Sequence, residues 1–168
     1  MKNPAEELND DSLALVVRRH LCVGWFSLLV FLTLGLALEA LHGLKVQAYL
    51  NAMNETRRLM WTLAHAHGTL LALVQLGFAF TVLQVPAWRA RPRTIASKSL
   101  LAAGVLMPGG FFLGGVWVYA GDPGLGILLV PVGGVLLFVA ALLAALSLKH
   151  VTIPSAKSDG GKTRPAKR

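Results

Sequence analysis

Apolar residues along this chain are gathered into four long blocks, and nearly all charged residues lie outside these blocks, between them or at the two ends of the chain. The blocks cover residues 21–44, 59–85, 100–120 and 126–148. Each reaches the roughly 20 residues that a helix needs to cross a bilayer core of about 30 Å at about 1.5 Å per residue. The blocks show no strand-like alternation, and backbone groups in lipid must be satisfied within their own segment. The pattern predicts an all-α fold, an integral membrane four-helix bundle.

The stretches outside the blocks complete the predicted domain plan. Residues 1–20 are expected to form a cytoplasmic N-terminal segment and residues 21–150 the four-helix transmembrane domain. Residues 151–168 are rich in Lys, Ser, Gly and Pro, which predicts a disordered basic cytoplasmic tail. The first block is too long for the core of a signal peptide and follows acidic residues, so we expect it to stay in the mature chain.

The basic residues predict which ends of the helices face the cytoplasm. With four spans, 13 of the 16 Lys and Arg residues lie at the chain ends or between the second and third blocks. Only Lys45, Arg57 and Arg58 lie between the first two blocks. Cytoplasmic segments of membrane proteins carry the excess of Lys and Arg. We therefore expect a multi-pass protein of a bacterial-type inner (plasma) membrane, with both termini cytoplasmic.

Composition narrows the classes of partner. Of the 168 residues, 55% are hydrophobic and 14% are charged, and the formal net charge is +8. The basic residues border the apolar blocks and do not form a face with interleaved aromatics, so a nucleic-acid partner is not expected and the lipid bilayer is. Cys22 is the single cysteine, which excludes an internal disulfide and a cluster of several thiolates.

Four ionisable residues share one layer of the predicted bundle, toward its outer face. Glu39 and His42 lie near the end of the first block, and His65 and His67 lie early in the second. Glu39 and His42 are three residues apart, so they share a helix face and the carboxylate could orient the imidazole. His65 and His67 are two apart, roughly 200° around a helix, and point to opposite sides. One is expected to meet the first helix and the other the third or fourth.

This layer supports three hypotheses. In the first, the protein binds haem b or a transition metal for electron transfer or as a respiratory accessory. His65, His67 and His42 would then be the ligands and Glu39 would support them, while Gly68 admits a packed helix or a flat macrocycle. In the second, the histidines only bridge helices and the chain is a cofactor-free structural or assembly subunit. In the third, the same layer serves a small carrier or proton-conducting protein.

Other polar residues receive simpler interpretations. His20 and His150 are predicted to be solvated at the cytoplasmic ends of the bundle. Gln75 and Gln84 are predicted to hydrogen-bond between helices. No set of nucleophile, base and orienting residue is visible, so the sequence does not favour an enzyme. Possible partners are therefore subunits of a membrane complex or further copies of the chain.

Small residues predict how the last two helices pack. Gly110 and Gly114 are spaced to allow close approach of two helices in lipid, and they are predicted to face Gly133 and Gly134. The run Gly121-Asp122-Pro123-Gly124 predicts a tight turn between these helices. The two helices are therefore expected to form an antiparallel hairpin.

The sequence around the ionisable layer resembles known proteins. Glu39-Ala-Leu-His42-Gly and Met60-Trp-Thr-Leu-Ala-His65-Ala-His67-Gly68 resemble uncharacterised small four-helix bacterial membrane proteins with an Ala-His-Ala-His-Gly motif. More remotely, His-x-His in a membrane helix is similar to the catalytic subunit of haem-copper oxidases, where such a pair sends ligands to two sites. The remote similarity implies that His65 and His67 could bind haem or metal. It does not imply oxygen reduction, because the rest of that ligand set is missing.

Overall fold

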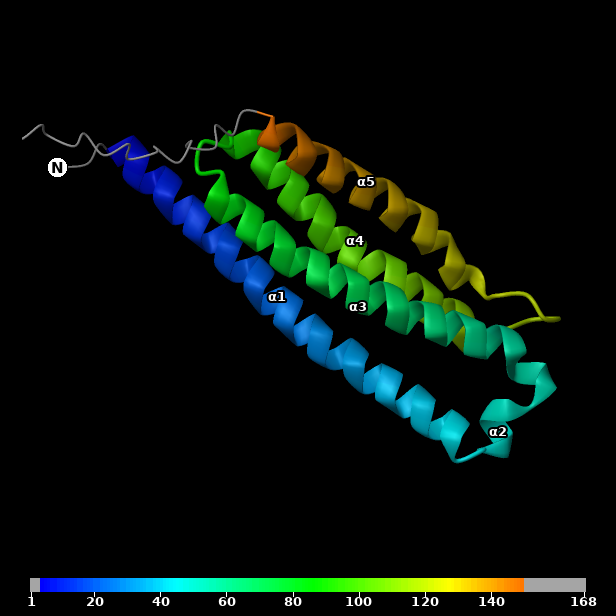
Figure 1. Ribbon diagram of the computed structural model, residues 1–168. Helices are drawn as coiled ribbons and strands as arrows, with labels where there is room; N and C mark the ends of the chain where they lie inside the picture. The colour runs from blue at the N-terminus through cyan, green and yellow to red at the C-terminus, as the bar shows by residue number, and fades with distance from the viewer. Residues whose placement is uncertain (1–3, 150–168) are drawn as a thin grey trace, which may run out of the picture.

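The computed structural model describes residues 4–149, with side chains from Asp11 onward, and this part of the chain is almost entirely helical (Figure 1). Four of its helices are long and apolar enough to cross a membrane. The long helices are α1 (Pro4–Gly43), α3 (Glu55–Gln84), α4 (Ala90–Val116) and α5 (Leu129–Leu148). Three short helical segments connect them, namely α2 (Gln47–Leu50), η1 (Ala52–Asn54) and η2 (Leu125–Leu128). The predicted tail at 151–168 and His150 lie outside the described residues.

Helix α1 begins well before the first apolar block. We predicted a separate segment over residues 1–20, but the helix is continuous from Pro4. Proline suits the first position of a helix, and the Ala-Glu-Glu-Leu that follows has high helix propensity. The 40-residue helix is therefore about 60 Å long at 1.5 Å per residue. Figure 1 shows its N-terminal end extending past the neighbouring helix ends.

Helix α4 also begins earlier than predicted. It starts at Ala90, ten residues before the apolar block at 100–120, and it ends at Val116. Pro92 lies in the first turn, where its missing N–H removes no helical hydrogen bond. The backbone N–H of Arg93 then makes an early helical bond to the Arg89 carbonyl, at 3.2 Å. Polar residues that resembled a loop, including Ser97, are consequently placed on a helix.

The long helices pack in chain order, so that α1 contacts α3, α3 contacts α4, and α4 contacts α5. The two middle helices are the more buried ones: 39% and 44% of their most apolar stretches are buried, against 11% for both α1 and α5. The larger core cluster lies where α3 ends and α4 begins, and contains Val17, Phe78, Ala79, Val82, Val85, Trp88, Ala96, Leu100 and Ala140. A smaller cluster of Met60, Ala64 and Phe111 lies toward the other end.

The hairpin between α4 and α5 turns two residues earlier than predicted. Tyr119 and Asp122 exchange both backbone hydrogen bonds, at 3.1 and 2.9 Å, so the turn residues are Ala120 and Gly121. Both have positive φ, 51° and 91°, as in the two-residue turns that match the twist of a hairpin. The run from Gly121 to Gly124 is therefore not the turn itself, although the antiparallel arrangement of α4 and α5 is as predicted.

Glycines do allow α4 and α5 to approach closely, but in a different register. A Cβ on Gly110 would lie 3.0 Å from the Gly126 carbonyl oxygen, so Gly110 faces η2. Gly133 instead packs against Met107, where a Cβ would lie 3.0 Å from the backbone nitrogen. Gly134 has open space around its Cα. The prediction of close packing is confirmed, whereas the prediction that Gly134 takes part is wrong.

Candidate functional site

His65 of α3 is directed at the backbone of α1. Its Nδ1 donates a hydrogen bond to the carbonyl oxygen of Phe31, at 2.7 Å. The ring lies against Gly35, where a Cβ would come within 2.3 Å of the His65 Cε1 and 2.7 Å of its Nε2. Any larger residue at position 35 would displace the imidazole. His65 therefore bridges two helices, with its ring packed against Gly35 of α1.

Gly68 completes this contact from the other direction. A Cβ at Gly68 would lie 2.3 Å from Cδ1 of Phe31, so the phenyl ring fills the space that the glycine leaves. The flat neighbour allowed by Gly68 is thus an aromatic side chain of α1. His65 on Gly35 and Phe31 on Gly68 form a reciprocal pair of contacts in which each helix offers one ring and one glycine.

His67 faces the opposite side of α3, as the two-residue spacing predicted. Its ring lies 4.7 Å from the ring of Phe111 in α4, measured between centroids. Its Nδ1 donates to the carbonyl oxygen of Leu63, one turn earlier in the same helix, at 2.9 Å. In the neutral imidazole this leaves Nε2 as an acceptor or ligand nitrogen. The prediction that one histidine meets the first helix and the other a later helix is confirmed.

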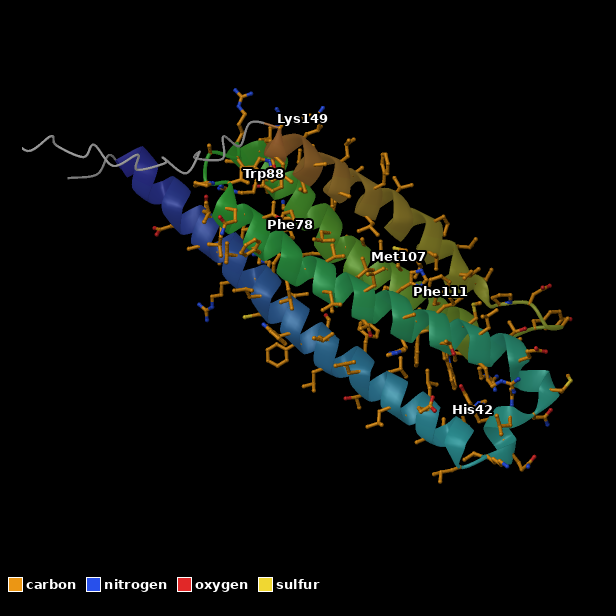
Figure 2. All side chains as sticks on the ribbon, viewed as in Figure 1. His42, Phe78, Trp88, Met107, Phe111 and Lys149 are labelled. Carbon is orange, nitrogen blue, oxygen red and sulfur yellow. The ribbon has the colours of Figure 1, made fainter. Side chains whose placement is uncertain are left out.

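Glu39 and His42 lie near the end of α1, and both side chains are exposed. Figure 2 places His42 at the end of α1 beside α2, far from Phe78 and Trp88. Among the residues that the structure describes, no three His, Cys, Asp or Glu side chains gather into a group that could hold a metal ion. The predicted layer is thus divided between the α1 interface, the α4 interface and the surface.

The most buried polar site is one that the sequence did not indicate. His20 was expected to be solvated, but its exposed fraction is 0%. Its Nδ1 bonds to Oε1 of Gln75 in α3, and its Nε2 lies 2.8 Å from Oγ of Ser97 in α4. Gln75 and Ser97 are also buried, at 1% and 2% exposure. A single imidazole therefore connects three helices.

The hydrogen bonds of this cluster have a defined direction. Nε2 of Gln75 donates to the carbonyl oxygen of Leu100 at 3.1 Å, which leaves its Oε1 as the acceptor toward His20. Nδ1 of His20 is then the protonated nitrogen, and Nε2 accepts from the hydroxyl of Ser97. The hydrogen bonds run in series from the hydroxyl of Ser97 through His20 and Gln75 to the backbone carbonyl of Leu100. When His20 is neutral, every donor and acceptor in this series has a partner, as buried polar groups require.

This arrangement also limits what His20 can do. Both of its ring nitrogens are engaged, so neither is available to a metal. Ser97, His20 and Gln75 follow the order of a nucleophile, base and orienting residue, but at 2% exposure the hydroxyl of Ser97 is closed to a substrate.

The predicted role of Gln75 as an interhelical hydrogen-bond partner is confirmed. Gln84 is exposed and lines a surface cavity.

Arg93 lies beside this cluster and is buried, with 1% exposure. It was counted among the cations of a cytoplasmic loop, but it occupies the first turns of α4. One guanidinium nitrogen donates to Oγ of Ser12 in α1 at 3.0 Å, and another lies 3.4 Å from the carbonyl oxygen of Trp88. Arg93 therefore connects α1 to the start of α4.

Helical periodicity is the signal that could have revealed His20. Val17, His20 and Gly24 are buried and follow the three- and four-residue spacing of the helix face that later presents Phe31 and Gly35 to α3. Because the predicted helix began at residue 21, His20 was assigned to a terminal segment. The partners Gln75 and Ser97 are far away in the sequence, and no local pattern shows that they meet.

Comparisons with protein-family models, with curated proteins and with solved structures find no match to this chain. The resemblance of its motifs to small four-helix bacterial membrane proteins and to haem-copper oxidases gains no support from them.

Proposed function

We propose that this chain is a multi-pass protein of a bacterial-type inner membrane and acts as a cofactor-free structural or assembly subunit of a membrane complex. Its histidines stabilise contacts between helices. The observation that carries the proposal is the use of their ring nitrogens: His20 uses both in bonds to other helices, and His65 uses its Nδ1 in a bond to α1 and packs its ring against Gly35. A ligand histidine needs a nitrogen with open space for the metal.

The charge distribution supports the proposed orientation. The α3–α4 connection and the end of α5 lie at the same end of the bundle in Figure 1. Arg89, Arg91 and Lys149 are exposed there. At the other end, Arg57 donates to the carbonyl of Gly115 at 3.0 Å and Arg58 to the carbonyl of Tyr49 at 3.2 Å, so both cations have local structural partners. This distribution favours a cytoplasmic α3–α4 end.

The shape of the bundle supports a role in assembly. Helix α1 is an edge helix whose most apolar stretch is only 11% buried, and its N-terminal end projects past the neighbouring helices (Figure 1). Large apolar side chains such as Trp25, Phe26 and Leu36 are exposed along it, at 63%, 71% and 72%. Lipid covers such a face by default, and the projecting end offers a contact outside the membrane. Partner subunits or further copies of the chain are the proposed partners.

Binding of haem b or a transition metal is the alternative function, and one observation favours it. The Nδ1 of His67 donates to a carbonyl, which is how many ligand histidines are oriented, and its Nε2 is free of protein hydrogen bonds in the described region. One histidine is not a complete site, however. Exposed His42 or Glu39, or a residue of a second chain, would have to supply the remaining ligands.

The visible spectrum and metal content of the purified protein separate these functions. The protein should be expressed with ample haem and metal, extracted in mild detergent and analysed by absorption and elemental analysis. We expect no stoichiometric Soret band and no stoichiometric metal. Gently solubilised native membranes should contain the chain in an assembly larger than the single 17.9 kDa chain. A Soret band that His67→Ala abolishes and His65→Ala preserves would replace this proposal with the cofactor function.

A further inference from the structure

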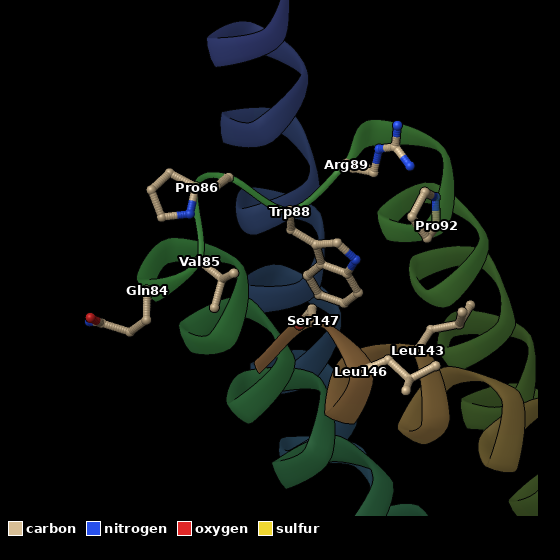
Figure 3. Close-up of a pocket in the computed structure, with 10 residues that line it drawn as sticks. Gln84, Val85, Pro86, Trp88, Arg89, Pro92, Leu143, Leu146 and Ser147 are labelled. Carbon is tan, nitrogen blue, oxygen red and sulfur yellow. The ribbon is translucent and has the colours of Figure 1, made fainter. Parts of the chain in front are cut away.

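A cavity of about 420 Å³ opens between the α3–α4 connection and the last turns of α5. Val85, Trp88, Leu143 and Leu146 form its apolar wall, and Arg89 is the one cation among its lining residues. Figure 3 shows the Trp88 indole between the connection and the end of α5. Trp88 has 6% exposure, so its ring is a fixed wall of the cavity.

A second cavity, of about 320 Å³, follows along the same two helices toward the middle of the bundle. It lies between Gly77 and Phe78 of α3 and Ala140 and Ala144 of α5, with Leu100 of α4 among its lining residues. Leu143 lines the first cavity and Ala144 the second. The two cavities follow one another along α3 and α5, over about 15 Å for residues 137–147 of α5 at 1.5 Å per residue, and are together called the crevice below.

The crevice changes in chemistry along its length. The part of the crevice toward the middle of the bundle is lined mainly by aliphatic, alanine and glycine residues. A Cβ on Gly77 would meet no atom within 4 Å. Its mouth carries the exposed guanidinium of Arg89, directly before the first residue of α4, where the helix dipole adds positive potential. An apolar slot with a cation at its mouth is complementary to an amphiphile with an anionic head and an extended hydrocarbon chain.

We propose that this crevice binds one anionic phospholipid, with its phosphate at Arg89 and an acyl chain along Trp88 and Phe78 toward Gly77. The site rests on the membrane-spanning part of the proposed function, because the mouth must lie at the headgroups and the slot in the hydrocarbon. The excess of cations at this end places it in the cytoplasmic leaflet, where anionic lipids attract basic residues. The role as an assembly subunit is not required.

Trp88 provides a local probe of occupancy. In a variant with Trp25, Trp61 and Trp117 replaced by Phe, Trp88 is the only tryptophan. The variant is reconstituted in phosphatidylcholine vesicles that contain increasing mole fractions of one lipid with brominated acyl chains, either phosphatidylglycerol or phosphatidylcholine. Bromine quenches indole fluorescence only at short range. We expect phosphatidylglycerol to quench Trp88 at about fivefold lower mole fraction, the factor that one basic residue near an anionic surface contributes.

Matched variants test both parts of the site. Arg89→Gln should remove the preference for phosphatidylglycerol, whereas Arg91→Gln, which removes an exposed cation that does not line the cavity, should preserve it. Gly77→Leu places a side chain in the crevice and should reduce quenching by both lipids. Gly134→Leu introduces the same side chain at a glycine that also has open space but lies outside the crevice, and should leave quenching unchanged.

A measurement on the unaltered chain guards against damage from the tryptophan replacements. Native mass spectrometry of wild-type protein released from bicelles of mixed phosphatidylglycerol and phosphatidylcholine should find one retained lipid, enriched in phosphatidylglycerol over the bicelle ratio. Equal quenching by the two lipids with no enrichment would overturn the proposal, as would equal effects of Arg89→Gln and Arg91→Gln. Vesicle flotation resistant to alkaline wash reports membrane insertion separately, so failure of the lipid site is distinguished from failure of the membrane assignment.

Discussion

The hydroxyl oxygen of Ser97 lies 2.8 Å from Nε2 of His20, although 77 residues separate them in the chain. Together with Gln75, this pair holds α1, α3 and α4 at one buried point. Within a bilayer, interhelical hydrogen bonds contribute about 0.6 kcal/mol on average and up to about 1.7. The cluster should therefore stabilise the bundle modestly when intact, and breaking it should be costly because the remaining groups stay buried.

Replacing all three members of this cluster together should destabilise the protein less than the sum of the three single replacements. Gln75→Leu leaves Nδ1 of His20 without an acceptor, and we expect a loss of about 1–3 kcal/mol. The triple variant His20→Phe, Gln75→Leu and Ser97→Ala removes every partner at once. Its loss should be smaller than the sum of the single losses, because the three residues act as one network.

Unfolding of the detergent-solubilised protein by increasing fractions of a denaturing detergent measures these losses. Gln84→Leu is the matched control, because Gln84 lies on the same helix with its side chain exposed, and its effect should stay within about 0.5 kcal/mol. If the single losses simply add, the three residues do not form the network described.

Gly35→Ala should destabilise the contact between α1 and α3 through His65. A Cβ at position 35 would lie 2.3 Å from Cε1 of the imidazole, so the ring must move and lose its hydrogen bond to Phe31. We expect a loss of about 1–3 kcal/mol, as for other overpacked positions. Adding His65→Ala to Gly35→Ala should recover part of it. Gly109→Ala, at a glycine with open space, should be nearly neutral, and an equal loss there would contradict the contact.

The apolar pattern predicted much of the fold because the length of a membrane-spanning helix is set by bilayer thickness. It placed four long helices correctly and erred at their polar ends. Residues 4–20 and 90–99 are helical although charged and hydroxylated residues interrupt them. Charged and hydroxylated residues do not prevent a helix, but a search for apolar blocks does not detect the helical segments that contain them. Pro92 suggested a loop, because a proline breaks a helix in its interior but is tolerated in the first turn. The apolar pattern did not show where α4 begins, so it could not distinguish the two cases.

In the candidate site, too, local spacing predicted the placement of some residues and not of others. The opposite directions of His65 and His67 follow from 100° of rotation per residue, and they were predicted. The burial of His20 and Arg93 depends on which residues of other helices lie opposite them, and local spacing does not contain that information. The pairing of Ser97 with His20 is a tertiary contact of this kind.

The orientation can be tested with reporter fusions at the ends of the helices. Fusions after Asn51 and after Gly121 should behave as periplasmic, and a fusion after Arg91 should behave as cytoplasmic, because cytoplasmic segments carry the excess of Lys and Arg. Alkaline phosphatase and a fluorescent protein that matures only in the cytoplasm provide complementary readouts. A periplasmic signal at Arg91 would reverse the orientation and would move the lipid crevice to the outer leaflet.

Gly126→Ala should strongly destabilise the packing of η2 against α4 in the α4–α5 hairpin. A Cβ there would lie 2.8 Å from the backbone nitrogen of Gly114 and 2.5 Å from Cβ of Leu113, so atoms of the α4 backbone, which cannot rotate away, would have to shift. Gly110→Ala meets the end of the Val130 side chain at 2.9 Å and the carbonyl oxygen of Gly126 at 3.0 Å, and should be tolerated somewhat better. Gly134→Ala has open space and should gain slightly from the higher helix propensity of alanine.

The expected order of stability for these three variants is Gly134→Ala, then Gly110→Ala, then Gly126→Ala, with a loss of about 1–3 kcal/mol or more for the last. The same detergent-unfolding measurement gives the order, and alkaline extraction checks that each variant is still inserted. The comparison is internal, because each variant adds one methyl group to a glycine in or beside the same hairpin. Equal stability of Gly126→Ala and Gly134→Ala would show that η2 does not lie against Gly110 and Gly114, and the register of α5 on α4 would have to be revised.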